Sequence, residues 1–71
     1  MKTYYVIEHD TRGFLCDITI DGPIFKWGVP AYHRQTLKYI GKENAEEVIR
    51  KYKLPKNKVR AMEVRDPEVI P

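Results

Sequence analysis

Cysteine is almost missing from this sequence: of 71 residues, Cys16 is the only one. Without a second cysteine, no disulfide can close within the chain and no cysteine-rich zinc site can form. A lone cysteine is typical of a reducing compartment rather than of a secreted, disulfide-stapled domain, so we expect a cytoplasmic protein.

Long apolar runs are missing too. No stretch approaches the roughly 20 apolar residues that a membrane-spanning helix needs, and no apolar run follows a basic start at the N-terminus. We therefore expect no membrane partner. The hydrophobic share of 42% still supplies one small core. We predict a single domain over residues 1–71, in which residues 66–71 form a C-terminal tail.

The motifs that mark an enzyme are absent as well. The sequence holds no Walker loop, dinucleotide fingerprint, zinc-ligand spacing or serine-hydrolase elbow. Glu8, His9 and Asp10 are consecutive, but neighbours in an extended chain point to opposite faces and cannot converge on one atom. Cys16 lies in a strand phase that buries it, and buried thiols are inert. We predict no catalytic residue, no metal ligand and no cofactor, and expect that the protein is not an enzyme.

Acidic residues are missing from one stretch, although the net charge is only +3. Residues 26–60 carry ten basic and three acidic side chains, and no acidic residue lies between positions 50 and 60. The basic residues there either attract an anionic partner or are simply the solvated side chains of a helix end and a loop. They are Arg50, Lys51, Lys53, Lys56, Lys58 and Arg60.

The clearest pattern that is present is a helical period over residues 41–54. Four apolar residues recur at i, i+3, i+4 and i+7, which places them on one face of a helix. They are Ala45, Val48, Ile49 and Tyr52. Gly41 is an acceptable N-cap, and Asn44 offers a rival start. Pro55 stops the helix.

Five stretches have the β-branched, aromatic or alternating character of strands: residues 3–8, 14–20, 24–27, 36–40 and 59–64. Gly13 is expected to take the left-handed position of a hairpin before the second stretch. Pro23 weakens a tight turn at positions 21–22, so we expect a looser connection and an edge position for the third strand.

The stretch 14–20 alternates, and this predicts which side chains enter the core. Phe14, Cys16, Ile18 and Ile20 are expected on the core face, and Leu15, Asp17 and Thr19 on the other. In the last strand, either the pair Met62 and Val64 or the pair Val59 and Ala61 faces inward.

A single helix covers only one face of the sheet. We therefore expect the other face, which carries Tyr4 and Val6, to be open for binding or dimerisation.

The richest candidate contact surface combines aromatic and basic residues between positions 25 and 34. Trp, Tyr and Arg are the residue types that anchor interfaces, and aromatic rings beside cations also hold single-stranded nucleic acid. Alternatively, Phe25 and Trp27 fill core beneath the helix. The surface members proposed here are Trp27, Tyr32, His33 and Arg34.

Residues 39–49, Tyr-Ile-Gly-Lys-Glu-Asn-Ala-Glu-Glu-Val-Ile, carry a resemblance. An aromatic closes a strand, and a cap and a Lys/Glu-rich turn with Ala follow. This is similar to the arm-type DNA-binding domains of tyrosine recombinases, over about residues 14–52. Gly41 stands where that family has Thr, Asn44 replaces an acid, and an extra strand follows the helix. Small phage inhibitors, including anti-CRISPR proteins, share the outline. The resemblance implies a sheet-plus-helix fold and, in the recombinase domains, a sheet that enters the major groove.

We therefore predict an α+β fold: an antiparallel sheet of four or five strands with one α-helix packed on one face. The expected function is a small non-enzymatic binding or inhibitor module of phage or mobile-element type. It would occlude a larger macromolecular partner that handles nucleic acid, and a protein partner is favoured over nucleic acid. Direct DNA or RNA binding through the sheet and basic patch is one alternative. A structural homodimer is the other, so monomer and homodimer both remain open.

Overall fold

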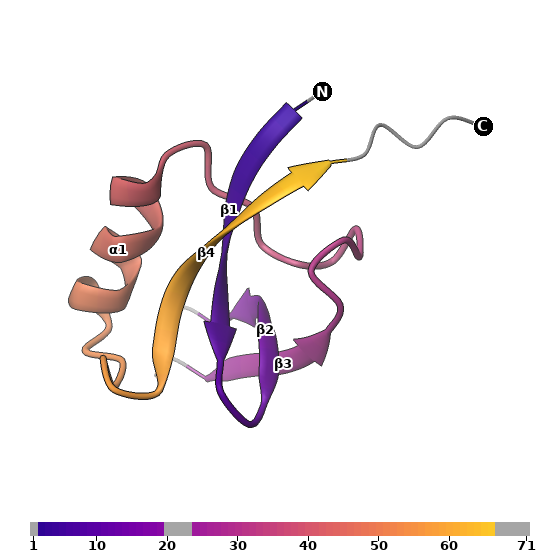
Figure 1. Cartoon of the computed structure of the whole chain (residues 1–71). Coiled ribbons are helices and arrows are strands. Elements are labelled where there is room, and N and C mark those ends of the chain that lie inside the picture. The colour runs from indigo at the N-terminus through magenta and orange to yellow at the C-terminus, as the bar shows by residue number, and fades with distance from the viewer. Residues whose placement is uncertain (1, 20–23, 67–71) are drawn as a thin grey trace.

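The computed structural model describes residues 2–19 and 24–66. It has the predicted α+β fold, with one four-stranded antiparallel sheet in the order β3-β2-β1-β4 and one helix that lies beside β1 and β4 (Figure 1). The elements in chain order are β1 (Lys2–His9), β2 (Gly13–Ile18), β3 (Phe25–Val29), α1 (Lys42–Lys51) and β4 (Val59–Asp66). The expected edge position of the third strand is confirmed.

β1 is one of the two inner strands, and its two neighbours pair with it to different extents. It pairs with β4 along its whole length, from Lys2↔Asp66 to His9↔Val59. The paired positions with β2 are Glu8↔Phe14 and His9↔Gly13. Further along the same edge of β1, the backbone of Tyr5 exchanges two 2.8 Å hydrogen bonds with Tyr39.

The predicted strand over residues 36–40 is wrong. One isolated bridge at Tyr39 is all that forms there, because the segment bonds to two strands in turn. The Leu37 amide donates to the Leu15 carbonyl of β2 (3.0 Å), and two residues later Tyr39 bonds to Tyr5 of β1. The segment therefore crosses the opening between β2 and β1 instead of running along either strand.

The predicted alternation in β2 holds for Ile18, which packs against the core under α1. It is wrong for Phe14, which packs on the opposite face, and for Leu15 and Cys16, because both β2 and β3 are irregular. The register passes from Phe14↔Val29 to Leu15↔Trp27 and then to Asp17↔Lys26, so Gly28 and Cys16 are each an extra residue in their strand. Such bulges shift the side chains that follow to the other face. Leu15, expected to face away from the core, is fully buried in it. Cys16 is only half-buried, with its thiol 3.3 Å from the Lys26 carbonyl oxygen.

The core under α1 contains the predicted stripe of the helix. Ala45 and Ile49 are buried, and Val48 and Tyr52 pack against them, as expected. Strand residues complete this core, and each fully buried aliphatic side chain contributes about 1.5–3 kcal/mol. Its buried members are Ile7, Leu15, Ala45, Ile49, Leu54 and Val59.

The opposite face of the sheet was expected to be open, and this is wrong. Val6 and Val64 are buried there together with Ala31, which belongs to the segment between β3 and α1. The Thr36 hydroxyl donates to the Pro30 carbonyl oxygen (2.6 Å), which closes this loop on itself, and the Tyr4 hydroxyl lies 3.4 Å from the Ala31 carbonyl oxygen. α1 therefore lies on one side of the β1–β4 pair and most of this segment on the other (Figure 1).

The structure agrees with one of the two predicted starts of α1 and differs from its predicted end. Gly41 is the N-cap with extended backbone (φ −121°, ψ 154°), so the rival start at Asn44 is wrong. The helix ends at Lys51, before the predicted Leu54, because Lys53 adopts a left-handed backbone conformation. The predicted tail over residues 66–71 is wrong at its first residue, because Asp66 is the last residue of β4. Residues 67–71 and the connection at positions 21–23 lie outside the described residues.

The Tyr39 side chain provides a test of the packing beneath α1. Burial, with the neighbouring Tyr52 as a smaller cause, raises the pKa of the Tyr39 phenol. Burial in the folded state disfavours the ionised phenolate relative to the neutral phenol. The contribution of the neutral Tyr39 to the free energy of unfolding is therefore complete below the unfolded pKa of roughly 10, and it is lost as pH rises through the folded value. We expect unfolding free energy to fall above pH 10, and the fall to be shallower in Tyr39→Phe, measured by urea unfolding. Equal pH profiles would contradict this placement.

Candidate functional site

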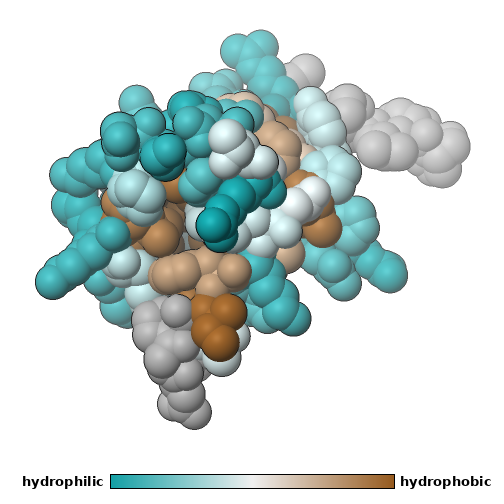
Figure 2. Space-filling model, turned by 90° about the horizontal axis from the view of Figure 1, so that it is seen from below, coloured by the Kyte–Doolittle hydropathy of each residue, from teal (hydrophilic) through white to brown (hydrophobic). Residues whose placement is uncertain are grey.

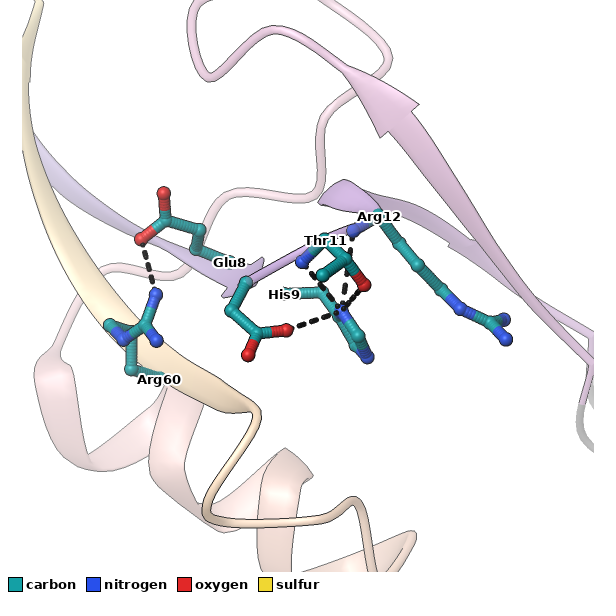
Figure 3. Close-up of polar contacts among 6 residues, drawn as sticks. Glu8, His9, Thr11, Arg12 and Arg60 are labelled. Carbon is teal, nitrogen blue, oxygen red and sulfur yellow. Dashed lines mark hydrogen bonds and ion pairs between the residues drawn. The ribbon is translucent and has the colours of Figure 1, made fainter.

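The turn between β1 and β2 is organised by His9. Its ring Nδ1 accepts hydrogen bonds from the backbone amides of Thr11 (3.1 Å) and Arg12 (3.3 Å) (Figure 3). The Asp10 carboxylate lies 3.3 Å from the same Nδ1. His9 therefore fixes the backbone of Arg12, whose side chain extends away from the ring (Figure 3).

Glu8 does not join this turn. Its carboxylate accepts a hydrogen bond from the Arg60 guanidinium on β4 at 2.9 Å (Figure 3). Glu8 thus binds Arg60, whereas the Asp10 carboxylate contacts the His9 ring, so the three consecutive side chains do not converge on one atom. Both members of the Glu8–Arg60 pair are at least partly exposed, so the pair contributes less than about 1 kcal/mol.

Three aromatic rings connect β3 to the C-terminal end of α1. Phe25 and Trp27, two positions apart on β3, share a face and lie 6.5 Å apart between ring centroids. The Phe25 ring also meets Tyr52 edge to face at 5.7 Å, and the His9 ring meets Trp27 at 5.2 Å. Phe25, Trp27 and Tyr52 are half-buried and pack against the core under α1, as the alternative interpretation of Phe25 and Trp27 predicted.

The end of α1 has a strained backbone. The Leu54 amide donates to the Ile49 carbonyl (2.9 Å) and the Lys53 amide to the Arg50 carbonyl (3.1 Å), which together form a Schellman motif. The residue in the left-handed position of this motif is usually glycine, but here it is Lys53, with φ 55°. Among the described non-glycine residues, Lys53 alone has a positive φ. A left-handed conformation costs an ordinary residue about 1–2 kcal/mol.

These elements border an open groove of about 570 Å³ between the β1–β2 turn, β3 and the end of α1. The Asp10 amide donates to the Lys58 carbonyl (2.9 Å), which holds the turn against the α1–β4 loop. We call this site the aromatic–basic groove. Three rings and three cations define it: Phe25, Trp27, Tyr52, Arg12, Lys53 and Lys58.

The charge of the aromatic–basic groove is not neutralised within the described residues. Among the described residues, no ion pair involves Arg12, Lys53 or Lys58. None of the described residues that line the groove carries a carboxylate. The view from below, onto the end of the molecule where β1 turns into β2, shows hydrophilic surface flanking a band of intermediate and apolar surface (Figure 2). The groove therefore combines unpaired positive charge with apolar rings.

The structure brings together three of the residues predicted for binding: Trp27, Lys53 and Lys58. Two others, Arg50 and Lys56, line a separate hollow of about 350 Å³ between α1 and β4, together with Glu46.

Lys51 and Arg60 have partners of their own, since the Lys51 ammonium lies 5.5 Å from the centre of the Tyr52 ring and Arg60 binds Glu8. Tyr32, His33 and Arg34 are exposed in the loop whose Ala31 covers the opposite face of the sheet. The single predicted surface is therefore divided among several locations.

Sequence reasoning did not include Arg12, Phe25 and Tyr52 in the binding surface. Tyr52 was assigned to the core stripe of the helix, and Phe25 was given a core alternative. One signal was available, since residues two positions apart on a strand, such as 25 and 27, share a face. Nothing in the spacing of the sequence places Arg12 or Tyr52 near them.

Among residues 2–19 and 24–66, no group of three or more His, Cys, Asp and Glu side chains is arranged to hold a metal ion. In that same part of the chain, no helix combines the length and apolar character needed to cross a membrane.

Comparison with protein-family models found no match, and searches of curated proteins and of solved structures found no similar protein.

Proposed function

We propose that this chain is a small, non-enzymatic binding module that holds an anionic macromolecular partner in the aromatic–basic groove. The observation that carries the proposal is Lys53. A lysine occupies a left-handed position that glycine would fill at lower cost, and its side chain lines a groove with two further unpaired cations. Backbone strain of this kind is typical of positions kept for a contact.

The inhibitor hypothesis belongs to this proposal. A phage- or mobile-element-type module that occludes a nucleic-acid-handling protein would use the same cations, with an acidic protein surface as the anion. The cytoplasmic location is also part of the proposal and depends on the lone cysteine. Unpaired cations on a groove rim raise the local concentration of such a partner and its association rate.

Lys53→Gly separates binding from stability. Removing the left-handed strain is expected to raise the unfolding free energy by about 0.5–1 kcal/mol. This increase corresponds to a melting temperature that is higher by roughly 2–8 °C. At the same time, one cation leaves the groove. Binding to labelled single-stranded oligonucleotide or poly-L-glutamate, followed by fluorescence anisotropy, is expected to weaken. For an oligonucleotide, the slope of log affinity against log salt should fall by about 0.7.

Lys56→Gln is the matched control, because Lys56 lies outside the groove. We expect it to change the affinity for either polyanion less than Lys53→Gly does. An unmodified protein that binds neither polyanion at low salt would refute the proposal. Equal losses from the two lysine variants would place the contact elsewhere.

A further inference from the structure

We infer that the anion held in the aromatic–basic groove is single-stranded nucleic acid, with one or two bases against the rings and phosphates on Arg12, Lys53 and Lys58. This inference rests on the proposed function and narrows it to one class of partner. An acidic protein surface offers carboxylates to the cations, but a carboxylate side chain carries no ring that can stack on the aromatic residues. A nucleotide offers both groups within one ligand.

The groove has the composition needed for a base and its phosphates. Phe25, Trp27 and Tyr52 come from β3 and the end of α1, and they form one connected set of rings. The cations come from three other places: the β1–β2 turn, the residue after the C-cap of α1, and the α1–β4 loop. A volume of about 570 Å³ lies within the range of pockets that hold drug-sized ligands, and a nucleotide is of that size.

A duplex fits this site less well, for two reasons. Bases in a duplex are stacked on one another and present only their edges in the grooves, so they cannot bring a face to half-buried rings. A sheet that enters the major groove needs a free face. Here α1 covers one face, and Ala31 lies with buried Val6 and Val64 on the other. The single strand is therefore the favoured ligand.

Trp27 is the only tryptophan of the chain, so intrinsic fluorescence reports on the groove directly. We would titrate the unmodified protein with four probes of matched length: a thymidine oligonucleotide, an abasic oligonucleotide with the same phosphates, a DNA duplex and poly-L-glutamate. The thymidine oligonucleotide is expected to quench Trp27 and to bind about 5- to 100-fold more tightly than the abasic one. Affinity for both oligonucleotides should fall with added salt.

A second measurement uses labelled oligonucleotides and anisotropy with Trp27→Leu. This variant is expected to lose the preference for thymidine over abasic strand while it keeps salt-dependent binding of the abasic strand. Tyr32→Leu, in the exposed loop, is the matched control and should keep the preference. Far-UV circular dichroism verifies that each variant is folded, and the comparison of probes on the unmodified protein does not depend on any variant.

The outcomes distinguish this inference from the proposed function. Equal, salt-dependent affinity for the thymidine and abasic strands overturns the single-strand inference and leaves the anion-binding proposal in place. Tighter binding of the duplex or of poly-L-glutamate than of the thymidine oligonucleotide also overturns the single-strand inference and leaves the anion-binding proposal in place. It would identify the partner as duplex DNA or as an acidic protein, respectively. No binding of any probe at low salt overturns both.

Discussion

Leu15→Ala is expected to remove most of the stability of this domain. Leu15 is fully buried between β3 and the residues beneath α1, and its carbonyl accepts the amide of Leu37. Truncating a buried leucine costs about 2–5 kcal/mol, through the lost transfer energy and the cavity left behind. A core of this size supplies only about 3–5 kcal/mol in total. Urea unfolding followed by Trp27 fluorescence should show a much lower midpoint or no cooperative transition.

Cys16→Ala is the matched control for that experiment. If β2 alternated regularly, Cys16 would be the core residue and Leu15 would tolerate truncation. The irregular register reverses this expectation, because Cys16 is only half-buried and its thiol contacts a carbonyl oxygen. We expect Cys16→Ala to cost less than Leu15→Ala by at least about 1 kcal/mol. The opposite ranking would mean that the bulges are misplaced.

Ile7→Val, with an expected cost of about 0.5–1.5 kcal/mol, provides a milder probe of the same core.

The sequence predicted the elements whose periodicity is regular and local. The stripe of α1 repeats over about two turns, and its burial beneath one face follows from helix geometry. β1 was predicted from its β-branched and aromatic composition, and β4 was predicted as a strand with its inward face left open. The phase of β2 was not predictable in this way, because the bulges at Cys16 and Gly28 depend on how two strands meet. The cover over Val6 and Val64 likewise comes from a loop, and a loop has no periodicity to recognise.

The candidate site was predictable only in part, for a related reason. Trp27, Lys53 and Lys58 were singled out by residue type, but grouping them with Arg12 and Tyr52 requires the tertiary arrangement. The backbone strain at Lys53 is likewise invisible in the sequence, where a lysine at a helix end has an ordinary explanation in the helix dipole. Residue types therefore indicated the chemistry of the surface, and the fold determined which residues share it.

Gly13→Ala is expected to destabilise the fold and also to disturb the groove. Gly13 begins β2 with φ +94°, a conformation that a residue with a side chain adopts only with strain. An added Cβ would also lie 3.0 Å from the Cα of Gly28, a backbone atom that cannot rotate away. We expect a loss of about 1–3 kcal/mol in unfolding free energy. Because Gly13 follows Arg12 directly, the same change should weaken polyanion binding by the molecules that remain folded.

Gly28→Ala isolates the steric part of this effect. Gly28 also has a positive φ (+131°), but a Cβ built there meets nothing within 4 Å, so the variant carries the backbone strain without the close approach. The difference in unfolding free energy between the two variants therefore measures how tightly β2 and β3 approach each other beside the β1–β2 turn. Urea unfolding should rank Gly13→Ala as the less stable of the two. If Gly28→Ala is equally or more destabilising, the close approach of Gly13 to Gly28 does not limit the fold, and Arg12 is positioned by the His9 hydrogen bonds alone.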